Sequence, residues 1–534
     1  MSFTRDAGRL DQRFDLLVVG GGIYGAWIAY DAALRGLSVA LVEARDWAAG
    51  TSSASSKLIH GGLRYLEYGW FGLVAKALRE RARLVRLAPH RVRPLRFLLP
   101  LYPDARAGRL ALKAALTLYD GLAGARPEVG RHRAFAADDL MELAPFLDPR
   151  ALAGGFAYGD ASEDDARLTL ELAAGAAAAG AVALNRCEVV RLMREGDRVI
   201  GAQVVDRVDG SGREVRARTT VVAAGAWSTS LAGLDDTPAL GWARYTKGSH
   251  LVMPALPSTR RDAFLLTAPG DRRVFFLIPW YGRTLLGTTD TDWRGDPSTI
   301  AVDDADTDYL LTAAARRCPG LGWTRADVHG AFAGLRTLRA SDAAHPGAVN
   351  REWSLESPLA NLLVPIGGKL TSARVEACQT VDRVFAALGR RAPACATARR
   401  PLPWAPGEPW RPWLADAVLA GVRAGLDAAT AANAARRYGR TLPTLLARVT
   451  AYPAHAARIV PDLAFCWAEL AHAAAHEQAL DLADVLRRRV PLAILARLNR
   501  ATVERAAAIV GVVLDWDAAQ RASEVERVLA RSTW

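Results

Sequence analysis

An apolar run at residues 15–19 ends in three consecutive glycines, Gly20 to Gly22. Apolar residues then recur at helical spacing as far as Gly36, and a second apolar run covers residues 38–42. This order of strand, glycine turn, helix and strand is typical of a βαβ unit, which belongs to a parallel sheet. The pattern therefore predicts an α/β domain at the start of the chain.

Gly20, Gly22 and Gly25 have the spacing of a dinucleotide fingerprint, and they lie between a predicted strand and a predicted helix. In that context the first glycine permits a tight turn, the second lets a pyrophosphate approach the backbone, and the third allows close packing of helix on sheet. Glu43 ends the second strand, where a carboxylate can accept hydrogen bonds from the adenosine ribose. We expect a dinucleotide without a 2′-phosphate.

A β-branched run at residues 220–222 leads into small residues that include Gly225. Flavoproteins use such a late strand where the chain returns beneath the dinucleotide, although any buried strand can look the same. The sequence has no second glycine fingerprint for a nicotinamide partner. A single dinucleotide site means that electrons must leave by another carrier.

The amino-acid composition changes near residue 399, where a proline-rich stretch is followed by an Ala/Leu/Arg-rich sequence with helical periodicity. We expect a separate helical domain there, without an obvious catalytic constellation. A chain of 534 residues with 51% hydrophobic residues is long enough for two or three domains.

Charge and cysteine content narrow the function classes. The net charge of +12 favours anionic partners, and residues 76–113 hold eleven Lys/Arg against two acids, mixed with apolar residues. This segment is either an ordinary solvated face or a membrane-binding surface, in which Phe97, Leu98 and Leu99 would enter the bilayer. Because it offers few aromatic residues for base stacking, we expect no nucleic-acid partner.

The five cysteines are widely spaced, which predicts no metal site and no disulfide framework.

A loop rich in hydroxyls and glycines follows Glu43 and reads TSSASSKLIHGGLRYLE at residues 51–67. This string closely resembles the FAD-dependent (aerobic) glycerol-3-phosphate dehydrogenases. The resemblance extends over almost the whole chain, through DDARL at 164–168, KGSH at 247–250, FFLIPW at 275–280 with GTTD at 287–290, GLRTL at 334–338 and GGKLT at 367–371. The chain departs from the family pattern at three positions. Tyr24 stands where a small polar residue is usual, and Ala226 and Thr337 each stand where a proline is frequent.

The resemblance implies an α/β fold with three parts. A Rossmann-like FAD-binding domain over residues 15–398 would carry an interleaved α+β cap of the D-amino-acid-oxidase-like type, mainly 75–160 and 240–335. A helical C-terminal domain would cover residues 399–534. No window has about 18 apolar residues without a charge, and the N-terminus does not resemble a signal peptide, so nothing is expected to span a bilayer.

The chemistry of the matched motifs suggests individual roles. For substrate binding we expect Arg64, Tyr65, Arg336 and Lys369, because Arg and Lys bind phosphate well. His250 is the candidate base, since its unperturbed pKa lies near neutrality, and Arg336 would assist catalysis by stabilising the alkoxide. The helix after GGKLT would direct its N-terminus at the flavin. Besides Gly20, Gly22, Gly25 and Glu43, the expected cofactor-binding residues are Thr51, Ser52, Ser55, Ser56, Lys57, Gly225, Gly367, Gly368, Leu370 and Thr371.

The implied activity is oxidation of glycerol 3-phosphate with non-covalent FAD, followed by electron transfer to ubiquinone. We then expect a cytoplasmic protein bound peripherally to an anionic surface, the inner face of the cytoplasmic membrane, with a homodimer as an open alternative. A glycerol-3-phosphate oxidase that uses oxygen, or a related amine or amino-acid oxidase, are the rival enzyme classes. A basic RNA-modifying flavoprotein and a non-catalytic flavin-binding protein are more distant alternatives.

Overall fold

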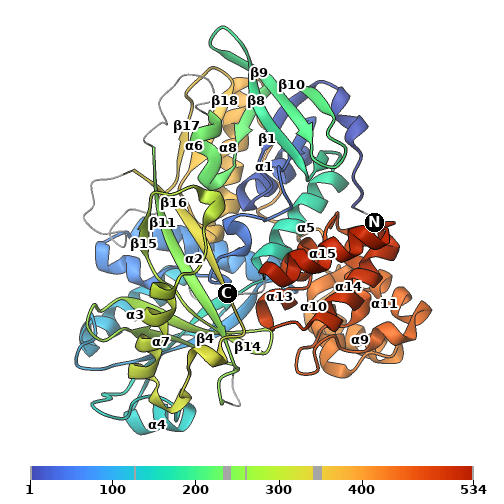
Figure 1. Cartoon of the computed structure of the whole chain (residues 1–534). Helices are drawn as coiled ribbons and strands as arrows, with labels where there is room; N and C mark the ends of the chain where they lie inside the picture. Colours follow the sequence, from blue (N-terminus) through green and yellow to red (C-terminus); the bar gives the residue numbers. More distant parts are fainter. Residues whose placement is uncertain (1–2, 125–127, 233–241, 259–260, 341–351, 532–534) are drawn as a thin grey trace.

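The protein contains two large sheets and a group of C-terminal helices (Figure 1). The computed structural model describes residues 3–124, 128–232, 242–258, 261–340 and 352–531. In Figure 1 the first sheet is in the upper part, the second lies lower left, and the helices from α9 to α15 gather at lower right.

The first sheet is built around the predicted βαβ unit. Strand β1 (Phe14–Val19) pairs in parallel with β2 (Val39–Val42) on one side and with β10 (Gly212–Val222) on the other. Helix α1 (Ile23–Leu34) connects β1 to β2. The predicted strand, turn, helix and strand, and the late strand beneath the dinucleotide turn, are therefore confirmed. The sheet continues through β7 (Val182–Leu184), β17 (Ser354–Glu356) and β18 (Leu362–Ile366).

Apolar side chains cover both faces of this sheet. Helices α1, α5 (Asp165–Ala178) and α8 (Ala373–Ala387) share one buried cluster with alternate residues of β1, such as Leu16 and Val18. Leu17 and Val19 point to the other face and pack with the antiparallel strands β8 (Cys187–Glu195) and β9 (Arg198–Asp206). Burial on both faces explains why β1 is a continuous apolar run.

The second sheet is mostly antiparallel and uses strands from two separate parts of the chain. Its strands are β3 (Leu58–Ile59), β4 (Arg93–Pro100), β5 (Arg133–Phe135), β6 (Gly155–Ser162), β11 (Ala243–Met253), β12 (Ala263–Thr267), β13 (Val274–Trp280), β14 (Arg283–Gly287), β15 (Thr291–Trp293) and β16 (Gly330–Arg339). The helices that belong to the same parts of the chain are α2 (Phe71–Leu87), α3 (Arg109–Ala123), α4 (Ala137–Leu143) and α7 (Asp304–Arg317). Short α6 (Ser228–Ala232) follows β10.

The basic segment at residues 76–113 is part of this folded body. Phe97, Leu98 and Leu99 lie in β4 and are 1%, 0% and 8% exposed, because β4 is an inner strand between β6 and β12. The expectation that these three side chains enter a bilayer is wrong. This short apolar run forms a buried strand. Periodicity alone does not distinguish such a strand from a membrane-binding segment.

The C-terminal region is helical, as expected. It comprises α9 (Trp410–Arg423), α10 (Ala428–Tyr438), α11 (Leu442–Ala451), α12 (Trp467–His476), α13 (Leu492–Leu495), α14 (Arg500–Val513) and α15 (Ala518–Arg531). Leu463, Leu470 and Val510 share an apolar cluster with Trp280 and Phe332 of the second sheet, so a hydrophobic core joins the C-terminal region to that sheet. No helix in the described ranges is long and apolar enough to cross a membrane.

Candidate active site

A cavity of about 740 Å³ is lined by residues of both sheets. This volume falls within the range of cofactor and ligand sites. Most of the predicted site residues line it, namely Gly20, Gly22, Glu43, Thr51, Ser52, Ser55, Ser56, Tyr65, Gly225, His250, Arg336, Gly367, Gly368, Lys369, Leu370 and Thr371. Gly25, Lys57 and Arg64 are not among the lining residues.

The glycine turn at one end of the cavity has no room for side chains. Gly20 has φ of +107°, and a Cβ there would lie 2.6 Å from the carbonyl oxygen of Ala223. A Cβ on Gly25 would lie 1.8 Å from the Gly20 carbonyl oxygen. Gly25 is thus where α1 crosses close to β1, as the fingerprint requires. Gly22 is the N-cap of α1, so the positive end of that helix faces the cavity.

Glu43 organises the turn itself. Its two carboxylate oxygens accept hydrogen bonds from the backbone N–H groups of Gly21 (2.7 Å) and Arg45 (2.8 Å). Burial raises the pKa of Glu43, and these two hydrogen bonds oppose the shift. The Ser52 hydroxyl accepts a hydrogen bond from the N–H of Ile23 at 2.9 Å and so occupies part of the N-terminus of α1. The ribose contact of Glu43 stays a prediction.

The loop at residues 51–57 does not place all of its polar side chains in the cavity. Lys57 is buried, and its Nζ donates to Asp165 Oδ1 (2.6 Å) and to the Ser53 carbonyl (2.5 Å). Asp165 also accepts from the Ser55 hydroxyl at 2.7 Å. This buried ion pair holds the Lys57 ammonium group outside the cavity lining, so its predicted contact with the cofactor is not supported.

Arg336 lies across the antiparallel pair β11 and β16. Its guanidinium donates to Asp290 Oδ1 (3.1 Å), Thr288 Oγ1 (2.9 Å) and the Lys247 carbonyl (3.2 Å). A Cβ on Gly248 would lie 2.3 Å from Nη2 of Arg336. The glycine of the KGSH motif therefore makes room for the arginine of the GLRTL motif.

His250 lies on the same strand as Gly248 and is almost fully buried. Its Nε2 is 2.9 Å from the Ser56 hydroxyl, and its ring stacks on Phe332 with centroids 4.9 Å apart. Burial, followed by the positive charges of Arg336 and Lys57, lowers the pKa of His250 to about 3. A Cβ on Gly287 would come within 2.4 Å of the imidazole, so this glycine also makes room for a site residue. The histidine is neutral at physiological pH.

Tyr65 and Lys369 meet at another wall of the cavity. Lys369 Nζ lies 3.6 Å from the centroid of the Tyr65 ring, a cation–π contact. A Cβ on Gly62 would lie 2.2 Å from the Tyr65 ring, and φ there is +80°. Arg64, the neighbour of Tyr65, is partly buried outside the lining, and its substrate contact stays a prediction.

Helix α8 begins at the cavity, as expected for the GGKLT motif. Lys369, Leu370 and Thr371 precede it and line the cavity, and the Thr371 hydroxyl accepts from the N–H of His60 at 3.1 Å. Gly367 and Gly368 both have φ of +81°, which allows the sharp turn before the helix.

Several lining residues had no individual signal in the sequence. His60 and Arg45 both line the cavity, and Arg45 stacks over the Trp227 ring at 4.5 Å. Tyr24 donates from its hydroxyl to Glu376 and closes one side of the cavity beside Gly368. The departure of Tyr24 from the family pattern was the one signal available.

Comparisons with known proteins agree with this geometry. The family model described as "FAD dependent oxidoreductase" matches residues 15–361, and that described as "C-terminal domain of alpha-glycerophosphate oxidase" matches residues 395–521. Glycerol-3-phosphate dehydrogenase 2 of Mycobacterium tuberculosis is 39% identical over 97% of this chain and 88% of its own. A glycerol-3-phosphate dehydrogenase of Synechocystis is 34% identical over 90% of this chain and 89% of its own. The solved FAD complex of the Bacillus halodurans glycerol-3-phosphate dehydrogenase superimposes with a TM-score of 0.79 and is 29% identical. The match covers 98% of this chain and 96% of that one.

The fold, the glycine turn and these matches define the class as an FAD-dependent oxidoreductase. Within that class the chain belongs to the FAD-dependent glycerol-3-phosphate dehydrogenase family. The site fits FAD, because the turn at Gly20 excludes side chains and the N-termini of α1 and α8 both open on a cavity of cofactor size.

Proposed function

We propose that this enzyme oxidises sn-glycerol 3-phosphate to dihydroxyacetone phosphate and passes the electrons to a membrane quinone. The observation that carries the proposal is the position of Arg336, which lines the FAD-type cavity together with His250. Gly248 of β11 leaves the space that the Arg336 guanidinium occupies. Solved glycine oxidases share the fold at 20% and 22% identity, a likeness that concerns the fold alone.

The cations of the cavity suit a phosphorylated substrate. Arg336 carries a planar guanidinium that would bind two phosphate oxygens in exchange for its bonds to Asp290 and Thr288, and Lys369 adds a point charge above Tyr65. Arg64 is expected to join them. Bound FAD would accept the hydride from the carbon that carries the secondary alcohol. The chain's own residues orient the substrate and manage its charge and proton.

His250 is the proposed acceptor of the hydroxyl proton. The imidazole is neutral and can therefore accept a hydrogen bond from the alcohol. The positive charge of Arg336 is one cause of its low pKa, so a phosphate dianion bound to Arg336 would offset that charge and strengthen the base. Arg336 would in turn stabilise the negative charge that develops on the substrate oxygen.

For electron transfer we propose docking of the enzyme on the inner face of the cytoplasmic membrane. Its support is a set of exposed apolar side chains near basic residues on α3 and the start of α2. Leu110 is 84% exposed, Leu118 is 42% exposed and Phe71 is 49% exposed, and Arg109 and Lys113 accompany them on α3. Apolar contact and attraction to anionic lipid would act together on such a surface.

Co-sedimentation with anionic vesicles, coupled to a quinone-reduction assay, tests both parts. The expected result is binding that high salt removes in part, and substrate-dependent reduction of a quinone in the vesicles. Leu110→Gln should weaken vesicle binding, whereas Val208→Gln, a change at another exposed apolar residue (58% exposed), should not. Rapid reduction of oxygen to peroxide with no vesicle binding would indicate the oxidase instead.

A further inference from the structure

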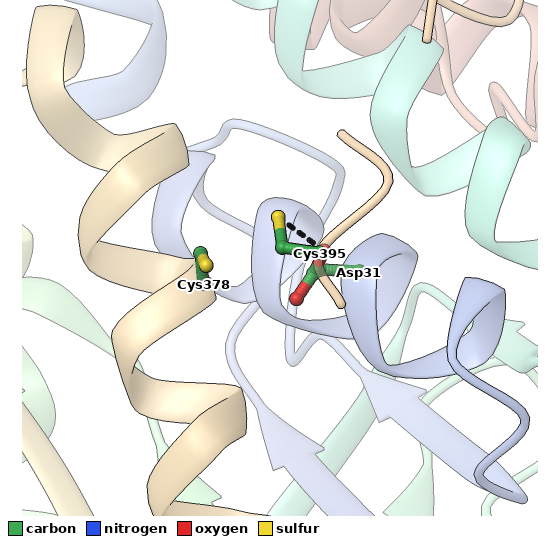
Figure 2. A group of neighbouring side chains, drawn as sticks. All are labelled: Asp31, Cys378 and Cys395. Carbon is green, nitrogen blue, oxygen red and sulfur yellow. Dashed lines mark hydrogen bonds between the residues drawn. The ribbon is translucent and has the colours of Figure 1, made fainter. Parts of the chain in front are cut away.

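Two cysteines, one on α8 and one in the segment after it, lie close together beside the first sheet (Figure 2). Cys378 lies on α8, and Cys395 lies in the segment that follows that helix, while Asp31 lies on α1. The two Sγ atoms and a carboxylate oxygen of Asp31 lie within 4.8 Å of one another. Both thiols are free and partly exposed, whereas Cys187, Cys318 and Cys466 are buried.

Positive charge approaches both sulfurs. Arg35 Nη2 donates to Cys378 Sγ at 3.1 Å and forms an ion pair with Asp31 at 2.6 Å. Arg374 Nη1 lies 3.8 Å from Cys395 Sγ. Two guanidinium groups in contact with the sulfurs oppose a metal cation. The hydrogen bond to Cys395 and burial raise the pKa of Cys378, so Cys395 is the sulfur that ionises first. Thiolate chemistry therefore suits this cluster better than a zinc site does.

The hydrogen bonds at Cys395 favour its deprotonation. Its thiol donates to Asp31 Oδ1 at 3.1 Å, and the Thr397 hydroxyl lies 3.0 Å from the sulfur. A hydrogen bond from Cys378 lowers the pKa of Cys395, burial opposes this shift, and Thr397, Asp31 and Arg35 add to the lowering. Burial and the neighbouring Cys395 raise the pKa of Asp31 to about 7, so this carboxylate can take the thiol proton near neutral pH.

We propose that Cys395 and Cys378 form a reversible thiol–disulfide pair that is oxidised by hydrogen peroxide. The Cys395 thiolate attacks one peroxide oxygen, the O–O bond breaks, and hydroxide leaves and takes a proton to give water. The resulting sulfenic acid is attacked by the Cys378 sulfur, which loses its proton as a second water leaves. The two thiols are oxidised by two electrons, and one peroxide is reduced to two waters.

The positions of the two residues allow the bond to form. Cys378 is fixed on a helix, but Cys395 lies in a segment without regular structure. Side-chain rotation and a small shift of that segment can close the gap to the S–S bond length of about 2 Å. The disulfide would attach α8, which starts at the active-site cavity, to the chain just before the C-terminal helices.

The test treats the full-length FAD-containing protein with hydrogen peroxide, alkylates the remaining thiols under denaturing conditions and maps the peptides. We expect loss of two alkylatable thiols of the five, a cross-linked peptide pair that contains Cys378 and Cys395, and full recovery with dithiothreitol. Before oxidation, Cys395 should react with iodoacetamide at least about tenfold faster than buried Cys466.

Variants separate this chemistry from general oxidation. Cys378→Ser should accumulate a sulfenic acid at Cys395 that dimedone traps, and it should form no cross-link. Cys466→Ser should form the same cross-link as the unmodified chain. The proposal is overturned if peroxide leaves both thiols alkylatable, or if it oxidises Cys395 to the sulfinic acid while Cys378 stays free. It is also overturned if one Zn²⁺ binds the cluster and protects both thiols.

Discussion

Replacing Gly248 with alanine should displace Arg336 without disturbing the fold. The new Cβ would lie 2.3 Å from Nη2, 2.6 Å from Cζ and 2.7 Å from Nη1 of Arg336. The backbone at Gly248 does not have a positive φ, so alanine is compatible with strand β11. Because the atoms it meets are the far end of a flexible side chain, the arginine should give way and the strand should stay.

The size of the effect follows from the displacement. An ordinary contact needs about 3.4 Å, so the guanidinium must move by about 1 Å and gives up its present bonds to Thr288 and Asp290. A misplacement of about 1 Å at a reacting site can cost about a hundredfold in rate. We therefore expect kcat/KM for glycerol 3-phosphate to fall about a hundredfold, which corresponds to about 2.7 kcal/mol.

The assay is steady-state oxidation of glycerol 3-phosphate with an artificial dye acceptor, at equal flavin content and with urea unfolding measured in parallel. Gly212→Ala is the matched control, because a Cβ at this other strand glycine meets nothing within 4 Å. In an Arg336→Ala background the Gly248→Ala change should add almost no further loss. Wild-type kcat/KM in Gly248→Ala, or fully additive losses in the double variant, would refute the reasoning.

Three further predictions concern the cofactor, the buried ion pair and pH. Gly25→Ala places a Cβ 1.8 Å from the Gly20 carbonyl, so α1 must shift and purified protein should lose its flavin absorbance; full flavin content would contradict this. Lys57→Met leaves Asp165 buried without its cation and should lower the free energy of unfolding by about 3–5 kcal/mol in urea titrations, with partial recovery on adding Asp165→Asn. His250 has a folded pKa of about 3, below its unfolded value of about 6.5, so only the unfolded chain gains its proton as pH falls through that window. The free energy of unfolding should therefore decrease as the pH falls from 6.5 to 5, and it should decrease less in His250→Asn. Identical pH profiles for the two proteins would argue against a lowered pKa of His250.

The sequence predicted those features that depend on backbone shape and local periodicity. The glycine spacing at Gly20 and Gly25 reflects a turn that only small residues can form, so strand, turn and helix were found where expected. The start of α8 after Gly368 was predictable for the same reason. Family motifs also placed His250 and Arg336 at one cavity.

Features that depend on distant contacts could not be predicted. Lys57 pairs with Asp165, which lies 108 positions away, and nothing local shows that the lysine turns away from the cavity. The apolar run that includes Phe97 has the same composition whether it inserts into lipid or forms an inner strand. The meeting of Cys378 with Cys395 likewise depends on how the segment after α8 folds back.

Anaerobic titration of the purified yellow protein tests the central claim most directly. We predict that sn-glycerol 3-phosphate bleaches the flavin stoichiometrically, that glycine, D-amino acids and glycerol leave it oxidised, and that Arg336→Ala needs far more substrate. Bleaching by an amino acid, with no response to glycerol 3-phosphate, would contradict the account.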